Sequence, residues 1–140
     1  MNTNRFMYLF IVIAVLGVTA CAPSAEANPV DRFAGTWSGS MGFSDDPSAK
    51  QDVVVNIPTG CAVGNVCGDT TNPGVSCQWE MTLSALNQNV FEYKFSKTLS
   101  GGDPCEAGVG TGGTLTLQVD GTLMREHNTP MFTASGALTK

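Results

Sequence analysis

The sequence predicts an all-β domain, a small antiparallel up-and-down β-barrel of about eight strands, over residues 32–140. Three observations carry this prediction. Short segments of alternating apolar and polar residues are separated by glycine, proline, asparagine and aspartate, which is typical of antiparallel strands joined by turns. No segment has the periodicity of an amphipathic helix. A consistently apolar face would leave two bare edges in an open sheet, so we expect the last strand to close against the first.

The first half of the domain is expected to hold four strands, over residues 33–43, 52–57, 65–71 and 77–85. The sequence Asp45-Asp46-Pro47-Ser48 ends the first of them. The alternation is strictest in the fourth, where every second residue is apolar. The side chains expected to point inward are Phe33, Trp37, Met41, Val53, Val55, Ile57, Cys77, Trp79, Met81, Leu83 and Ala85.

The second half of the domain begins with a hairpin. Residues 90–97 follow the fourth strand after a turn at residues 87–89, and they direct Phe91, Tyr93 and Phe95 inward. The last three strands are expected over residues 114–119, 122–127 and 131–138.

The turn at Asp120-Gly121 decides the direction of Arg125. A two-residue type I′ turn pairs Leu117 with Met124, and Arg125 then lies on the outer face. A G1 bulge at Gly121 instead aligns Leu117 with Leu123 and turns Arg125 inward. We favour the bulge because it buries Leu123.

Four cysteines lie within the domain: Cys61, Cys67, Cys77 and Cys105. An even number suits an oxidising compartment, and four cysteines allow three connectivities. We favour Cys61 with Cys67 and Cys77 with Cys105, because Gly60 and Gly64 let the first pair close a short loop. The two bonds would stabilise the fold by roughly 2.4 and 3.6 kcal/mol. No metal site is expected, because no paired Cys-x-x-Cys spacing occurs and the sole histidine, His127, is distant in sequence.

An uncharged apolar run at residues 6–20 precedes the domain. With about 15 residues it is too short to span a ~30 Å bilayer core comfortably, and Arg5 lies before it, so it is interpreted as a cleaved secretory signal. Its end, Val18-Thr19-Ala20-Cys21, resembles the lipobox of bacterial lipoproteins. The alternatives are an uncleaved membrane anchor and an ordinary signal peptide cut after Ala20.

The lipobox resemblance implies a location. The sulfur of Cys21 would receive a diacylglyceryl group, and cleavage would make this residue the first of the mature chain, carrying acyl chains such as palmitate. Two or three chains give stable membrane attachment. Residues 21–31 are small, polar and interrupted by proline, as expected of a flexible tether. Because Ala22 and not aspartate follows the cysteine, the resemblance implies the outer membrane of a two-membrane bacterium, or the outer face of the cell membrane where there is one membrane.

Charge and motifs exclude several functions. The net charge of −5 becomes −6 when Arg5 is removed with the signal, so nucleic acid is not expected as a partner. The run from Gly108 to Gly113 matches G-x-G-x-x-G, but a strand follows it where a dinucleotide site needs a helix. The carboxylates Asp45, Asp46 and Asp52 lack the oxygen spacing of a calcium loop.

No enzyme activity and no cofactor are predicted. His127 beside Glu126, with Ser135 downstream, could suggest acid-base chemistry, but there is no nucleophile elbow and no second histidine. A single histidine near a strand end is interpreted as a surface residue.

The segment Phe33-Ala34-Gly35-Thr36-Trp37 resembles the Gly-x-Trp signature on the first strand of lipocalins and related calycins. Together with the strand count, the positions of Cys77 and Cys105 and the Asp-Gly-Thr-Leu hairpin, it makes residues 32–140 similar to a small bacterial lipocalin-like domain. In that family the tryptophan closes one barrel end beneath a basic residue from a late strand. The resemblance therefore implies that Arg125 lies over Trp37.

Two functions are weighed. The first is the binding of a small apolar ligand in the open mouth of the barrel, with the site formed by Trp79, Phe91, Tyr93 and Phe95 on two adjacent strands. The second is an envelope structural module, or a protein-interaction or inhibitor module, with a filled core and no ligand. A cavity of several hundred Å³ would favour the first.

Overall fold

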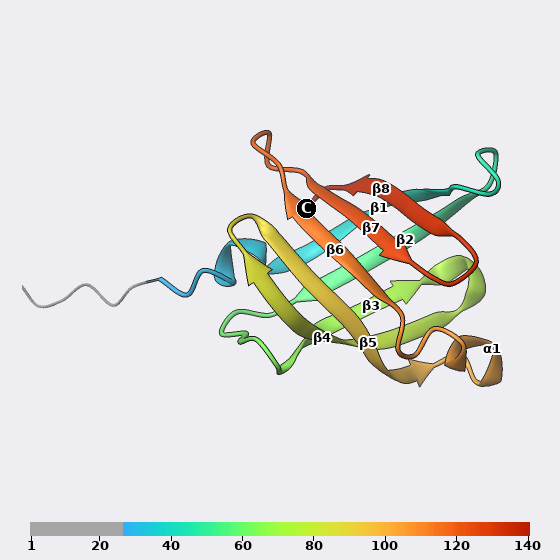
Figure 1. Cartoon of the computed structure of the whole chain (residues 1–140), viewed down its shortest axis with the longest axis horizontal. Helices are drawn as coiled ribbons and strands as arrows, with labels where there is room; N and C mark the ends of the chain where they lie inside the picture. Colours follow the sequence, from blue (N-terminus) through green and yellow to red (C-terminus); the bar gives the residue numbers. More distant parts are fainter. Residues whose placement is uncertain (1–26) are drawn as a thin grey trace, which may run out of the picture.

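The computed structural model describes residues 27–140, in which eight antiparallel strands form a closed barrel in sequence order, β1 to β8 (Figure 1). This confirms the predicted fold class. The predicted signal peptide and the lipid-anchor residue Cys21 lie outside the described residues. None of the helices in residues 27–140 has the length and apolarity needed to cross a bilayer.

The strands are β1 (Gly35–Phe43), β2 (Lys50–Ile57), β3 (Val66–Asn72), β4 (Cys77–Asn87), β5 (Val90–Ser100), β6 (Gly112–Leu117), β7 (Leu123–Asn128) and β8 (Thr133–Leu138). Three short helical turns connect or precede them: η1 (Asp31–Phe33), η2 (Pro73–Val75) and α1 (Asp103–Glu106). β4 and β5 extend further than predicted and form the longest hairpin.

The barrel closes where β1 meets β8. Gly42 pairs with Ser135, and a bridge joins Ser38 to Thr139. Two glycines make this approach feasible, because a Cβ atom on Gly39 would lie 2.4 Å from the Ala137 carbonyl oxygen. A Cβ atom on Gly136 would lie 2.3 Å from the Ser40 carbonyl oxygen. The seam therefore depends on glycine in both strands.

One end of the barrel is filled. η1, drawn in blue, lies beside the β4–β5 turn and directs Phe33 into the interior, where its ring contacts Phe91 at 5.5 Å between centroids (Figure 1). The indole N–H of Trp37 donates to the Phe33 carbonyl at 2.8 Å. The last part of the predicted tether also packs here, since Val30 is buried and the Asn28 amide donates to the Cys61 carbonyl.

The predicted inward faces are confirmed with one exception. The buried side chains include Phe33, Trp37, Met41, Val53, Val55, Ile57, Cys77, Trp79, Met81, Leu83, Phe91, Tyr93 and Phe95. Ala85 is the exception, because the β4–β5 register shifts between Leu83 and Ala85. This bulge pairs Leu86 with Phe91, and Leu86 packs against the core in place of Ala85.

The favoured geometry of the Asp120-Gly121 turn is confirmed. Gly121 has φ +84°, Leu117 pairs with Leu123, and Arg125 is 2% exposed. The proposed partner of Trp37 is wrong: the cation over its ring is Lys140, with Nζ 4.6 Å from the centroid. The register explains this. Arg125 pairs with Gly136, which lies against Ser40 and Met41, further along β1 than Trp37.

One of the two predicted disulfides is present. Cys77 and Cys105 are bonded, and the bond ties α1 to the start of β4. The predicted Cys61–Cys67 bond is not formed, and both residues are buried free thiols. Each thiol has a local acceptor instead, the Pro58 carbonyl for Cys61 and the Ala62 carbonyl for Cys67.

Candidate functional site

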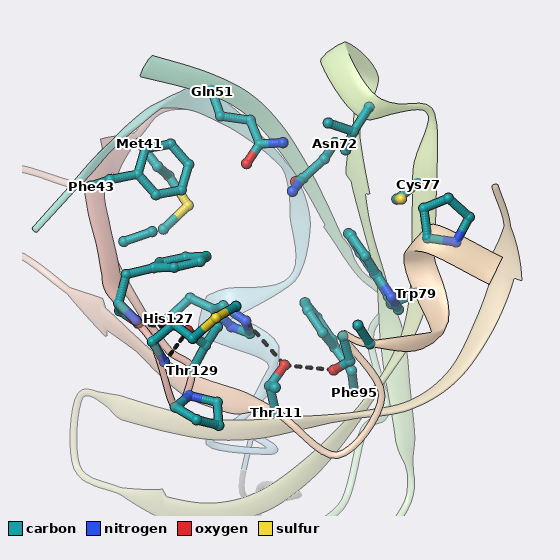
Figure 2. Close-up of a pocket in the computed structure, with 18 of the residues that line it drawn as sticks. Met41, Phe43, Gln51, Asn72, Cys77, Trp79, Phe95, Thr111, His127 and Thr129 are labelled. Carbon is teal, nitrogen blue, oxygen red and sulfur yellow. Dashed lines mark hydrogen bonds between the residues drawn. The ribbon is translucent and has the colours of Figure 1, made fainter. Parts of the chain in front are cut away.

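A cavity of about 330 Å³ occupies the barrel end opposite η1 (Figure 2). Its lining comes from the ends of strands that meet there, the last residues of β1, β3 and β7 and the first of β2, β4 and β8. The chain segment from α1 to β6 completes the rim. The volume is at the small end of the ~300–1,000 Å³ found for ligand pockets.

The walls of the cavity are mostly apolar and include two pairs of aromatic rings. The Trp79 and Phe95 rings stack with centroids 5.1 Å apart and planes 7° apart. The Phe43 and Phe132 rings meet edge to face at 5.2 Å. The Trp79 indole N–H donates to the Cys105 carbonyl at 2.7 Å, so the disulfide-tied α1 segment fixes this ring. Such a rigid aromatic wall suits an apolar ligand.

A chain of hydrogen bonds runs along the polar side of the cavity. Nε of Arg125 donates to the Tyr93 hydroxyl at 2.9 Å, and that hydroxyl lies 3.1 Å from Nδ1 of His127. On the other side of the ring, Nε2 lies 3.1 Å from the Thr111 hydroxyl, which donates to the Gly108 carbonyl (Figure 2).

The directions of these bonds fix the tautomer of His127. Because the Tyr93 oxygen accepts from Arg125, its proton is directed to Nδ1. Because the Thr111 proton is used by the Gly108 carbonyl, the Thr111 oxygen accepts from Nε2. In its neutral form the ring therefore carries its proton on Nε2.

Electrostatics agree with a neutral imidazole. Burial, followed by the charge of Arg125, lowers the pKa of His127 from 6.5 to about 3. Burial raises the pKa of Tyr93 above its ordinary value, against the opposing charge of Arg125. At neutral pH the chain of polar groups therefore has one charge, the guanidinium of Arg125.

Two polar atoms of the lining residues are buried without a hydrogen-bond partner in the described part of the chain. They are Nη1 of Arg125 and Oδ1 of Asn72. Asn72 lies across the cavity from Thr111 (Figure 2). Buried polar atoms are usually satisfied, so both can receive a polar group from a bound molecule.

Two of the four predicted ligand-binding residues line the cavity and two do not. Trp79 and Phe95 line the cavity. Phe91 and Tyr93 do not, and this part of the prediction is wrong: they are 0% and 1% exposed, and neither lines the cavity. β5 runs from its turn at the filled end toward the mouth, so Phe91 lies too deep, and Tyr93 reaches the site through its hydroxyl alone.

The interpretation of His127 as a surface residue is also wrong. It lines the cavity, and its ring stacks on Phe95 at 4.9 Å. The inward position of His127 was predictable from the sequence. Residues two apart in a strand share a face, so the bulge that turns Arg125 inward turns His127 inward as well. Phe43, Asn72 and Thr111 gave no comparable signal.

The remaining candidates do not form a site. Ser135 and Glu126 are exposed on β8 and β7, away from the His127 ring. Asp46 accepts from its own turn at Ser48, and Asp52 accepts from the Ser40 hydroxyl. No cluster of three or more His, Cys, Asp or Glu side chains suited to a metal ion occurs within residues 27–140.

The last two glycines of the run at residues 108–113 lie in β6 and are required by the pairing of the sheet. A Cβ atom on Gly112 would lie 2.2 Å from the Tyr93 carbonyl oxygen, and one on Gly113 would lie 1.9 Å from that of Glu126. The two glycines let β6 approach β5 and β7 closely. The run leads into a strand and not into a helix, as predicted.

No protein-family model, curated protein or solved structure matches this chain. The fold and the cavity define it as an eight-stranded antiparallel β-barrel with a ligand-sized, mostly apolar cavity at one end.

Proposed function

We propose that the protein is a lipid-anchored bacterial lipoprotein outside the cytoplasm, with a lipocalin-like barrel that binds a small apolar ligand in its open end. The observation that carries the binding function is the cavity of about 330 Å³ between Trp79, Phe95, Phe43 and Phe132. The alternative, an interaction module with a filled core, has less support because only one end of the barrel is filled.

The position of the cavity suits a tethered binding protein. The described chain begins at the filled end, where η1 packs, and the mouth is at the opposite end. A membrane anchor at Cys21 would therefore leave the mouth open to the surroundings. The Cys77–Cys105 disulfide suits an oxidising compartment.

Ligand binding is tested with N-phenyl-1-naphthylamine, a neutral apolar fluorophore whose emission rises in apolar surroundings. We expect saturable emission with the wild-type domain. Ala107→Phe adds bulk at the exposed rim of the cavity and is expected to weaken binding at least tenfold. Ala137→Phe, on the exposed outer face of β8, is the matched control and is expected to bind as the wild type does.

If wild-type emission does not change, or if Ala107→Phe binds as well as Ala137→Phe, the cavity is not the binding site.

Anchoring is tested separately by fractionation. The wild-type chain and a Ser24→Ala control are expected in the membrane fraction, and Cys21→Ala is expected to leave it. Sedimentation of Cys21→Ala with membranes would refute lipid attachment.

A further inference from the structure

We propose that the ligand of this cavity is a monocarboxylate with a compact apolar body, and that Arg125 binds its carboxylate group. This inference rests on the proposed function and adds the chemical class of the ligand.

The first argument is the burial of an unpaired charge. Arg125 is 2% exposed, and its guanidinium carbon lies 5.4 Å from the Tyr93 centroid and 5.8 Å from the Phe95 centroid. Nε donates to Tyr93, but Nη1 has no acceptor in residues 27–140. A buried charge is costly unless an opposite charge and hydrogen bonds compensate it.

The second argument is that the lining of the cavity supplies no opposite charge. The lining contains no aspartate or glutamate. The neutral polar groups beside Arg125 already hydrogen-bond to one another. The Tyr93 hydroxyl donates to Nδ1 of His127, and Nε2 of His127 donates to the Thr111 hydroxyl. An anionic group that enters the cavity would meet one permanent cation with free donors, in surroundings of low polarity where a charge-assisted hydrogen bond is strong.

The third argument concerns the class of anion. Guanidinium binds both carboxylate and phosphate. Arg125 supplies one positive charge, and no lysine lines the cavity. A carboxylate neutralises that charge, whereas a phosphate dianion would leave a negative charge among Phe43, Trp79 and Phe95. Charge balance therefore favours the monoanion.

The volume limits the apolar body. A cavity of about 330 Å³ is at the lower limit of known ligand pockets, so it suits a ring system or short chain and not a long acyl chain. The parallel Trp79 and Phe95 rings offer this body a flat wall.

The experiment compares two probes that differ in charge and hardly in shape, 2-naphthoate and 2-naphthamide, by competition against N-phenyl-1-naphthylamine at pH 7. We expect the wild-type domain to bind the carboxylate at least tenfold more tightly than the amide. Arg125→Met keeps a long side chain without the charge, and it is expected to abolish this preference. Arg125→Lys is expected to restore part of it.

Arg32→Met is the matched control, because Arg32 is exposed beside Phe33 at the filled end. It should leave the preference unchanged. Because loss of the buried Arg125 could prevent folding, the wild-type protein gives a second readout: the Arg125 Nε resonance should shift with naphthoate and much less with naphthamide.

Equal binding of the two probes, or a preference that survives in Arg125→Met, would overturn the inference and leave apolar ligand binding intact. If neither probe displaces the fluorophore although the fluorophore binds, the inference also fails. If the fluorophore itself does not bind, the proposed function fails and the inference fails with it.

Discussion

The neutral state of His127 predicts that this residue makes the barrel less stable in acid. His127 is the sole histidine of the chain, and its ring lies between the Tyr93 and Thr111 hydroxyls, against Phe95 and near Arg125. Its pKa is lowered from 6.5 to about 3, with burial as the main cause and the charge of Arg125 as the second. The perturbation we choose is His127→Gln, which stays neutral at every pH.

The sign follows from the two pKa values. Because the pKa is lower in the folded state, the unfolded chain binds the extra proton as the pH falls from about 6.5 toward 3. Folding stability therefore falls over this window. At pH 4 the unfolded histidine is protonated and the folded one is not, so the loss is about 3 kcal/mol at 1.36 kcal/mol per pH unit.

The assay is urea unfolding of both proteins at pH 7 and pH 4. The free energy of unfolding of the wild type should fall by about 3 kcal/mol more than that of His127→Gln. Carboxylates that also titrate in this range, such as Asp46 and Asp120 in their turns, are common to both proteins and cancel. Equal losses in the two proteins, or an imidazole proton resonance that titrates near pH 6.5, would refute the reasoning.

Three further predictions concern the framework of the barrel. Gly113→Ala should lower the free energy of unfolding, measured in urea, by about 3 kcal/mol or more, because its Cβ atom meets a β7 carbonyl. Gly74→Ala has open space around it and should change stability little. Equal effects of the two substitutions would contradict the β6–β7 packing. Replacing both Cys77 and Cys105 by alanine should lower the unfolding free energy by about 3–4 kcal/mol, and an unchanged Tm would argue against the bond. Burial, followed by the neighbouring Cys67, raises the pKa of the Cys61 thiol to about 12. Iodoacetamide should therefore label Cys61 slowly in the native protein and quickly in urea. Fast labelling of the native protein would contradict this burial.

Alternation in the sequence was sufficient to predict the barrel. The period of two in residues such as Trp79, Met81 and Leu83 determines which face is inward, and the consistent apolar face leads to closure. The bulge at Gly121 was also predictable, because only one register buries Leu123. These features depend on local geometry and on the cost of exposing apolar side chains.

Depth along the barrel could not be predicted in this way. Alternation identifies Phe91, Tyr93 and Phe95 equally as inward, but only the strand tilt and register decide that Phe95 reaches the cavity and Phe91 lies in the filled end. The same limit explains why the cation over Trp37 was predicted wrongly. Lys140 and Arg125 are both basic residues near the end of the sequence, and only the strand register decides which of them reaches Trp37.

The central claim is that ligands bind in the open end of the barrel, and the two tryptophans test it directly. The Trp79 indole lines the cavity, and the Trp37 indole lies at the filled end, hydrogen-bonded to Phe33. In a ¹⁵N-labelled domain saturated with N-phenyl-1-naphthylamine, the Trp79 indole resonance should move and the Trp37 resonance should stay in place. Movement of Trp37 alone, or of neither, would contradict the account.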